Sequence, residues 1–93
     1  MITIIIFSSN RIKYLSELIT DIKKCNFKKK NRIMIVSYNE TQSNIKKIKN
    51  ITKESYFSHF IEKQNLTFAE KLKKYSKMVK TKFFWHMSDD DRI

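Results

Sequence analysis

Hydrophobic residues gather in four short runs along the chain, at residues 2–7, 33–36, 56–61 and 83–87. The first two runs are almost continuously apolar and β-branched, as strands buried on both faces of a parallel sheet require. The third run is aromatic and β-branched, which favours a strand, although it also fits a helical turn. The fourth run is aromatic and ends abruptly in polar and acidic residues. The pattern therefore predicts four strands.

Between these runs the apolar residues recur with the spacing of an amphipathic helix. They predict a first helix over about residues 12–24. The residues of its apolar stripe are Leu15, Leu18, Ile19 and Ile22. A Lys-rich segment carrying Ile45 and Ile48 predicts a second, shorter helix.

The third helix has a clear start. Thr67 and Glu70 have the form of a capping box, in which each side chain accepts a hydrogen bond from a free backbone N–H of the other residue. An apolar stripe with spacings of four, three and four then predicts a helix to about residue 80. Its members are Phe68, Leu72, Tyr75 and Val79.

The order of these elements alternates strand and helix from end to end, which is typical of an α/β protein. We expect a mainly parallel, open sheet of about four strands, flanked by about three helices through right-handed crossovers. No repeat, linker or low-complexity segment divides the chain. Residues 1–93 are therefore expected to form a single domain.

Composition supports a folded chain but leaves the meaning of its charge open. Of 93 residues, 41% are hydrophobic, which is far from the composition of disordered segments. The 20 Lys and Arg against nine Asp and Glu give a net charge of +11. Such a charge suits a nucleic-acid, anionic-membrane or phosphate-bearing partner. A general bias toward Lys, Ile and Asn, with no Gly and no Pro, explains it equally well.

Two features of the sequence, its lone cysteine and its first apolar run, bear on the cellular compartment of the protein. The lone Cys25 can form neither an intrachain disulfide nor a cysteine metal site, which favours a reducing compartment. The apolar run at residues 2–7 is too short to span a membrane and lacks the charged leader of a signal peptide. We expect the cytoplasm, including the inner face of a membrane.

Candidate chemistry follows from the sheet. Ligands of open α/β sheets bind beyond the carboxyl ends of the strands, where loops and helix N-termini meet. Three segments occupy that position here, at residues 8–11, 37–40 and 88–91.

The acidic segment after the last strand is a candidate metal site. Asp89 and Asp91 are two positions apart, so in an extended segment their carboxylates point the same way and suit Mg²⁺ or Mn²⁺. A divalent ion would relieve the repulsion among three adjacent carboxylates and stabilise a departing phosphate. We expect the trio at the tip of an inner parallel strand. The alternative is a solvated acidic tail.

Four stretches of the sequence resemble motifs of family 2 glycosyltransferases, in the same order. Residues 2–11 resemble the opening strand and the Pro-Thr-x-Asn-Arg type loop, and Tyr14-Leu15 resembles the Tyr-Leu pair of the helix that follows. Residues 65–72 resemble the family's Asn-x-Gly-x-Ala segment, and residues 83–91 resemble the strand that leads into its Asp-x-Asp motif. The resemblance covers essentially the whole chain.

The resemblance implies the nucleotide-binding half of a GT-A fold, with a Rossmann-like sheet. It implies that a nucleoside-diphosphate sugar and Mg²⁺ or Mn²⁺ bind there, and that the sugar passes to a glycan or lipid-linked acceptor. The nucleotide-sugar residues would be Ser8, Asn10, Arg11, Ser37, Asp89 and Asp90, and the metal ligands Asp89 and Asp91.

The chain also departs from that family. Ser37, Tyr38, Asn39 and Glu40 stand where the family usually has an acidic pair and a Gly-Ser turn, and Thr67 replaces a usual Gly. The family's acceptor region and general base lie beyond the Asp-x-Asp motif. The resemblance thus implies an incomplete domain, inactive alone, whose uncovered last strand would cause self-association or need a second chain.

Two other classes compete with this interpretation. A small basic nucleic-acid-binding protein would explain the charge, but the aromatic residues lie within apolar runs and no recognition motif is present. A nucleotidyltransferase also uses paired carboxylates and a metal, but such enzymes usually have a glycine-rich phosphate loop, and this chain has no Gly.

Overall fold

The computed structural model describes residues 2–24, 31–79 and 83–88. Strands and helices alternate along this part of the chain as the sequence predicts. The strands are β1 (Ile2–Ser8), β2 (Arg32–Tyr38), β3 (Phe57–Glu62) and β4 (Phe83–Ser88), and the helices are α1 (Ile12–Lys24), α2 (Gln42–Ile51) and α3 (Phe68–Ser76). The run at residues 56–61, which also fitted a helical turn, is a strand.

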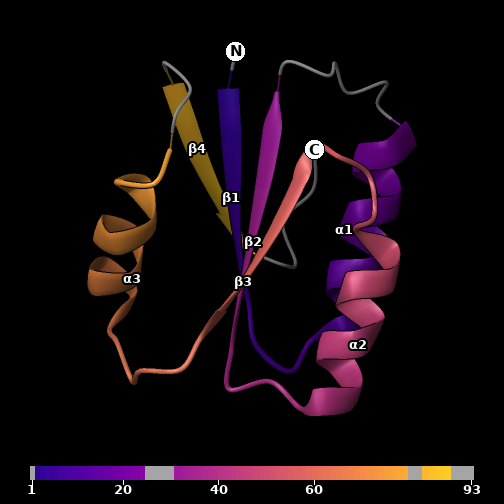
Figure 1. Cartoon of the computed structure of the whole chain (residues 1–93), viewed down its shortest axis with the longest axis horizontal. Coiled ribbons are helices and arrows are strands. Elements are labelled where there is room, and N and C mark those ends of the chain that lie inside the picture. Colours follow the sequence, from indigo (N-terminus) through magenta and orange to yellow (C-terminus); the bar gives the residue numbers. More distant parts are fainter. Residues whose placement is uncertain (1, 25–30, 80–82, 89–93) are drawn as a thin grey trace.

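The four strands form one parallel sheet in the order β3-β2-β1-β4. The predicted open parallel sheet with three helices is therefore confirmed. Two helices, α1 and α2, cover one face, and α3 covers the other (Figure 1). The expectation of an inner position for the last strand is wrong for the described residues, because β4 lies at an edge and pairs only with β1.

The face under α1 and α2 holds the larger apolar core. The predicted stripe of α1 is fully buried there, at 0–1% exposure. It packs with alternate residues of the strands, which point to the same face. The strand and α2 residues of this core are Ile4, Ile6, Ile33, Ile35, Ile48 and Phe57.

The face under α3 has a smaller core, which contains Ile5, Phe7, Met34, Val36 and Tyr75. The predicted capping box is confirmed: the Glu70 backbone N–H donates to the Thr67 hydroxyl over 3.2 Å, and the Thr67 N–H donates to Glu70 Oε1 over 2.9 Å. The helix ends at Ser76, before the predicted end near residue 80. Residue 80 itself lies outside the described residues.

None of the helices in the described segments has the length and apolar character that a membrane crossing requires. Cys25, the lone cysteine, lies outside the described residues.

Candidate functional site at the carboxyl edge of the sheet

The carboxyl ends of all four strands lie at one edge of the sheet, because the strands are parallel. We call this the carboxyl edge. The last residues of the strands are Ser8, Tyr38, Glu62 and Ser88. Ser8 is in register with Ser37, and Phe7 is in register with Ser88. The fold thus brings the predicted segments after β1 and β2 together, and β4 ends beside β1 at the same edge.

The path of the chain reverses between β1 and β4. From β1 the chain moves through α1 to β2 and through α2 to β3, with both helices on one face (Figure 1). It then crosses the other face through α3 and returns to the far side of β1. Ligands of open α/β sheets bind in the crevice that such a reversal creates at the carboxyl ends. In this sheet that position lies beyond the carboxyl ends of β1 and β4.

Two asparagines shape the loops at this edge. Asn10 and Asn39 have φ angles of 52° and 50°, in the left-handed region. Asparagine tolerates that region better than most residues that carry a Cβ. The chain has no glycine, and Asn39 takes the left-handed turn conformation that glycine adopts most easily. It lies in the segment where family 2 glycosyltransferases usually have a Gly-Ser turn.

Glu40 joins the two loops. Its Oε2 accepts a hydrogen bond from the Asn10 backbone N–H over 2.9 Å, and its Oε1 accepts one from Asn44 Nδ2 over 2.8 Å. One carboxylate thus holds the loop after β1 against the first turn of α2. Sequence reasoning treated Glu40 only as a departure from the family, because a contact across 30 residues leaves no local signal.

Four of the six predicted nucleotide-binding residues lie in the described part of the chain, and they divide into a buried and an exposed pair. Ser8 and Ser37 are 1% and 0% exposed, whereas Asn10 and Arg11 are exposed. The Ser37 hydroxyl lies 2.8 Å from His59 Nε2. Asn10 and Arg11 are therefore accessible to solvent, whereas the two serines are not.

The surroundings of His59 favour its neutral form. Burial lowers the pKa of its imidazole, the positive charge of Lys49 lowers it further, and the negative charge of Glu40 acts in the opposite direction. Its Nδ1 is buried without a hydrogen-bond partner in the described structure, which a neutral ring tolerates more easily than a charged one. Sequence reasoning found no motif around His59, since its partner Ser37 lies on a neighbouring strand.

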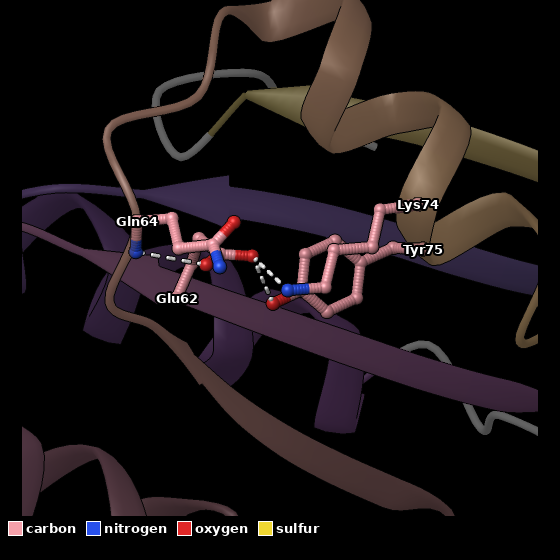
Figure 2. Close-up of polar contacts among 4 residues, drawn as sticks. All are labelled: Glu62, Gln64, Lys74 and Tyr75. Atoms are coloured by element: carbon pink, nitrogen blue, oxygen red, sulfur yellow. Dashed lines mark hydrogen bonds and ion pairs between the residues drawn. The ribbon is translucent and has the colours of Figure 1, made fainter.

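A second polar group lies at the carboxyl edge on the α3 face and is centred on Glu62, whose side chain is 2% exposed. Its Oε1 accepts hydrogen bonds from Lys74 Nζ over 2.6 Å and from the Tyr75 hydroxyl over 2.9 Å (Figure 2). Its Oε2 accepts one from the Gln64 backbone N–H over 3.0 Å. These hydrogen bonds lower the pKa of Glu62 to about 2, and the bond from Lys74 has the largest effect. Burial and the bond to Glu62 raise the pKa of Tyr75 to about 12.

Lys71 lies beside this group and is only 6% exposed. Its Nζ is 3.2 Å from the centre of the Tyr38 ring, so a cation–π contact holds the ammonium at the end of β2. Burial lowers the pKa of Lys71, while the nearby negative charge of Glu62 raises it. The helical stripe read from the sequence omits this residue, because the stripe counts apolar side chains only.

The predicted metal ligands Asp89 and Asp91, together with Asp90, lie outside the described residues. Within residues 2–24, 31–79 and 83–88, no three His, Cys, Asp or Glu side chains are grouped closely enough to hold a metal ion.

These features define a class: a Rossmann-like α/β sheet whose strand order reverses between its first and fourth strands. Among solved structures, the chain is similar to the mannosyltransferase PcManGT from Pyrobaculum calidifontis in complex with GDP-Man and Mn²⁺. The TM-score is 0.84 at 13% sequence identity, over 98% of this chain. The chain thus has the fold of part of a GT-A mannosyltransferase. Neither a protein-family model nor a curated protein matches the sequence.

The similarity concerns one part of that enzyme. The chain corresponds to 28% of the length of the mannosyltransferase. At this level of identity the likeness is one of fold, and residues do not carry over from it.

Proposed function

We propose that this chain binds a nucleoside-diphosphate sugar together with Mg²⁺ or Mn²⁺ at the carboxyl edge, as the donor-binding part of a glycosyltransferase. The observation that carries the proposal is the parallel placement of β4 beside β1, in register from Ile2 and Phe83 to Phe7 and Ser88. This placement starts the acidic segment at the edge that also holds the loop after β1, where the chain reversal favours a ligand.

The exposed side chains at this edge suit a diphosphate. Arg11 would pair with phosphate oxygens through its planar guanidinium, and Asn10 would offer amide hydrogen bonds. The buried Ser8 and Ser37 would form the floor under the nucleotide. Glu40 and Asn39 hold these loops in a defined conformation, and a loop that is held in this way loses less conformational freedom on binding.

The acidic segment would hold the cation, with Asp91 as the principal ligand and Asp89 near the ribose or the metal, and Asp90 would contribute to binding the sugar nucleotide. The residues present fit a hard cation, since carboxylate oxygens are its preferred protein ligands. When bound, the ion would neutralise the diphosphate and stabilise its departure as the sugar moves to a glycan or lipid-linked acceptor. No residue of the described structure is proposed as the general base.

The test is calorimetric titration of the chain with UDP, GDP and ADP, each with and without Mn²⁺. We expect Mn²⁺-dependent binding of one nucleoside diphosphate, with GDP the first candidate because the similar mannosyltransferase was solved with GDP-Man. Asp91→Asn should weaken binding about 10-fold to 100-fold, since loss of a ligand removes an oxygen from the metal.

Asp21→Asn is the matched control. It removes the same charge from the last turns of α1, which lie toward the opposite edge of the sheet. Equal effects of the two variants, or nucleotide binding that ignores Mn²⁺, would refute the proposal. Binding of RNA that falls steeply with salt and ignores Asp91 would support the nucleic-acid-binding class instead.

A further inference from the structure

A hollow lies on the α3 face of the sheet, at the amino ends of β2 and β3. Its volume is about 430 Å³, which is within the range of pockets that hold small molecules. Two of its lining residues are Arg32, the first residue of β2, and Ser58, the second residue of β3. The hollow is therefore at the edge opposite the proposed donor site, and we call this the amino edge.

The hollow is present because α3 is shorter than the strands that it covers. Its nine residues make a helix about 14 Å long, whereas the seven residues of β2 make a strand about 23 Å long. Where α3 covers the sheet, the Tyr75 ring packs with those of Phe7 and Phe60. Since the helix ends before the amino edge, Met78 and Val79 line the space that remains.

Most of the residues that line this space are apolar. Met34, Phe60 and Val79 belong to or pack against the smaller core under α3. Met78 is 41% exposed, and Phe60 and Val79 are half-buried. An apolar ligand would cover the exposed parts of these side chains, and their removal from water would stabilise the complex. Methionine side chains adapt their shape to such a ligand.

The polar part of the lining suits an anion. Arg32 is exposed, and it is the one charged side chain among the described residues that line the hollow. Its guanidinium has five N–H donors, so it can bind a carboxylate in addition to the interaction that it makes within the protein. Ser58 is exposed beside Met34, with which it is in register, and adds a hydroxyl donor.

We propose that the amino edge binds a small aliphatic carboxylate. The aliphatic chain lies against Met34, Phe60 and Met78, and the carboxylate accepts hydrogen bonds from Arg32 and Ser58. A nucleoside diphosphate does not suit this hollow, because most of its surface is polar and most of the lining is apolar. The inference is independent of the proposed donor site, which lies at the other end of the strands.

The experiment is a titration of the full chain with octanoate, followed by NMR of the methionine methyl groups. Met34 and Met78 line the hollow, whereas Met87 is on β4 in register with Ile6, toward the carboxyl edge. We expect saturable shifts of the Met34 and Met78 methyl resonances, with that of Met87 unchanged. Octanol has the same chain length without the charge, and we expect it to bind about tenfold more weakly.

Arg32→Gln tests the contact with the carboxylate. It should weaken octanoate binding about tenfold, because it removes the charge that meets the anion. Lys46→Gln is the matched control, since it removes the same charge from the exposed side of α2, on the other face of the sheet (Figure 1). It should leave octanoate binding unchanged, which separates a local contact from the general attraction of a chain with a net charge of +11.

Ser58→Leu tests whether the hollow itself holds the ligand. It should abolish octanoate binding, because the larger side chain occupies the space, and circular dichroism of all three variants checks that each is folded. Shifts that do not saturate, a shift at Met87 as large as that at Met34, or equal binding of octanol and octanoate would overturn the proposal. So would equal effects of Arg32→Gln and Lys46→Gln, or octanoate binding to Ser58→Leu at the wild-type level.

Discussion

The two faces of the sheet are packed by different chemistry. Under α1 and α2 the core is aliphatic, and the stripe of α1 is buried at 0–1% exposure. Under α3 the packing includes a buried carboxylate, Glu62, and a buried ammonium, Lys71. The side chains that meet these two charges are Tyr38, Lys74 and Tyr75.

The difference has a physical cause. The α1 helix has 13 residues and a full apolar stripe, whereas α3 has nine residues, few enough that an isolated helix of this length is unstable in water. The α3 face therefore depends on its capping box and on directed polar contacts. We expect the stability of the aliphatic face to be insensitive to pH, and that of the charged face to depend on it.

The largest expected effect is on the aliphatic face. Leu18→Ala should reduce the free energy of unfolding by about 3 kcal/mol, because it leaves a cavity beside residues that cannot collapse around it. Urea denaturation at neutral and at acidic pH should give the same loss. Tyr14→Ala, on the exposed side of the same helix, is the control and should change stability little.

Glu62→Gln should give the next largest effect, and this one depends on pH. The pKa of Glu62 is about 2 in the folded chain against an ordinary value of 4.5, so its contribution is fully present above pH 4.5. That contribution is lost as the pH falls toward 2. The melting temperature of the variant should therefore lie below that of the wild type at neutral pH and approach it in acid.

A gap between the two melting curves that stays constant down to pH 2 would contradict this account of Glu62. It would mean that the loss in the variant does not come from the charge of the carboxylate. A loss in Glu62→Gln greater than that in Leu18→Ala would reverse the comparison between the two faces, and the charged face would then dominate stability.

The sequence was sufficient for the strands and helices of the described residues, because they depend on local signals, but not for the position of the last strand, which lies at an edge of the sheet. Apolar runs predicted the strands and helical spacing predicted the helices, although the run at residues 56–61 also fitted a helical turn. The capping box at Thr67 was correct because its two partners are three residues apart. The stripe of α3 was less informative. Phe68, assigned to it, is 51% exposed, whereas Lys71, outside it, is 6% exposed.

The segments that meet at the carboxyl edge were predictable from the sequence, but the contacts between their side chains were not. The rule for parallel sheets gave the segments at Ser8 and Ser37, which the register places side by side. The contacts of Glu40 with Asn10 and of His59 with Ser37 join residues that are 30 and 22 positions apart. Only the order of strands across the sheet creates such contacts, and periodicity within one element carries no information about them.

Lys71→Met tests the charged face with a substitution that should stabilise the chain, whereas the two variants above should destabilise it. Burial lowers the pKa of Lys71, so the folded chain binds the proton of this ammonium less tightly than the unfolded chain does, and at neutral pH the buried charge lowers stability. Replacing it with an apolar side chain of similar length should stabilise the chain by about 1 kcal/mol at pH 7. The gain should shrink as the pH rises toward the ordinary lysine value of 10.5.

Chemical denaturation at pH 7 and pH 10 checks this prediction. A loss of stability in Lys71→Met at pH 7 would show that the contact of the ammonium with Tyr38 outweighs the cost of burial. Lys73→Met, on the exposed side of α3, removes the same charge and serves as the control.

The smallest effect is expected for an ion pair at the surface of the aliphatic face. Lys23 Nζ lies 2.9 Å from Glu54 Oε2, and the two side chains are 36% and 37% exposed. Glu54→Gln removes one hydrogen-bonded carboxylate, as Glu62→Gln does, but in a solvated setting. We expect a loss of about 0.5 kcal/mol, which 1 M salt should abolish because exposed pairs are screened. If Glu54→Gln instead matched Glu62→Gln in size and pH dependence, burial would not be what distinguishes the two faces, and the pH sensitivity assigned to α3 would belong to carboxylates in general.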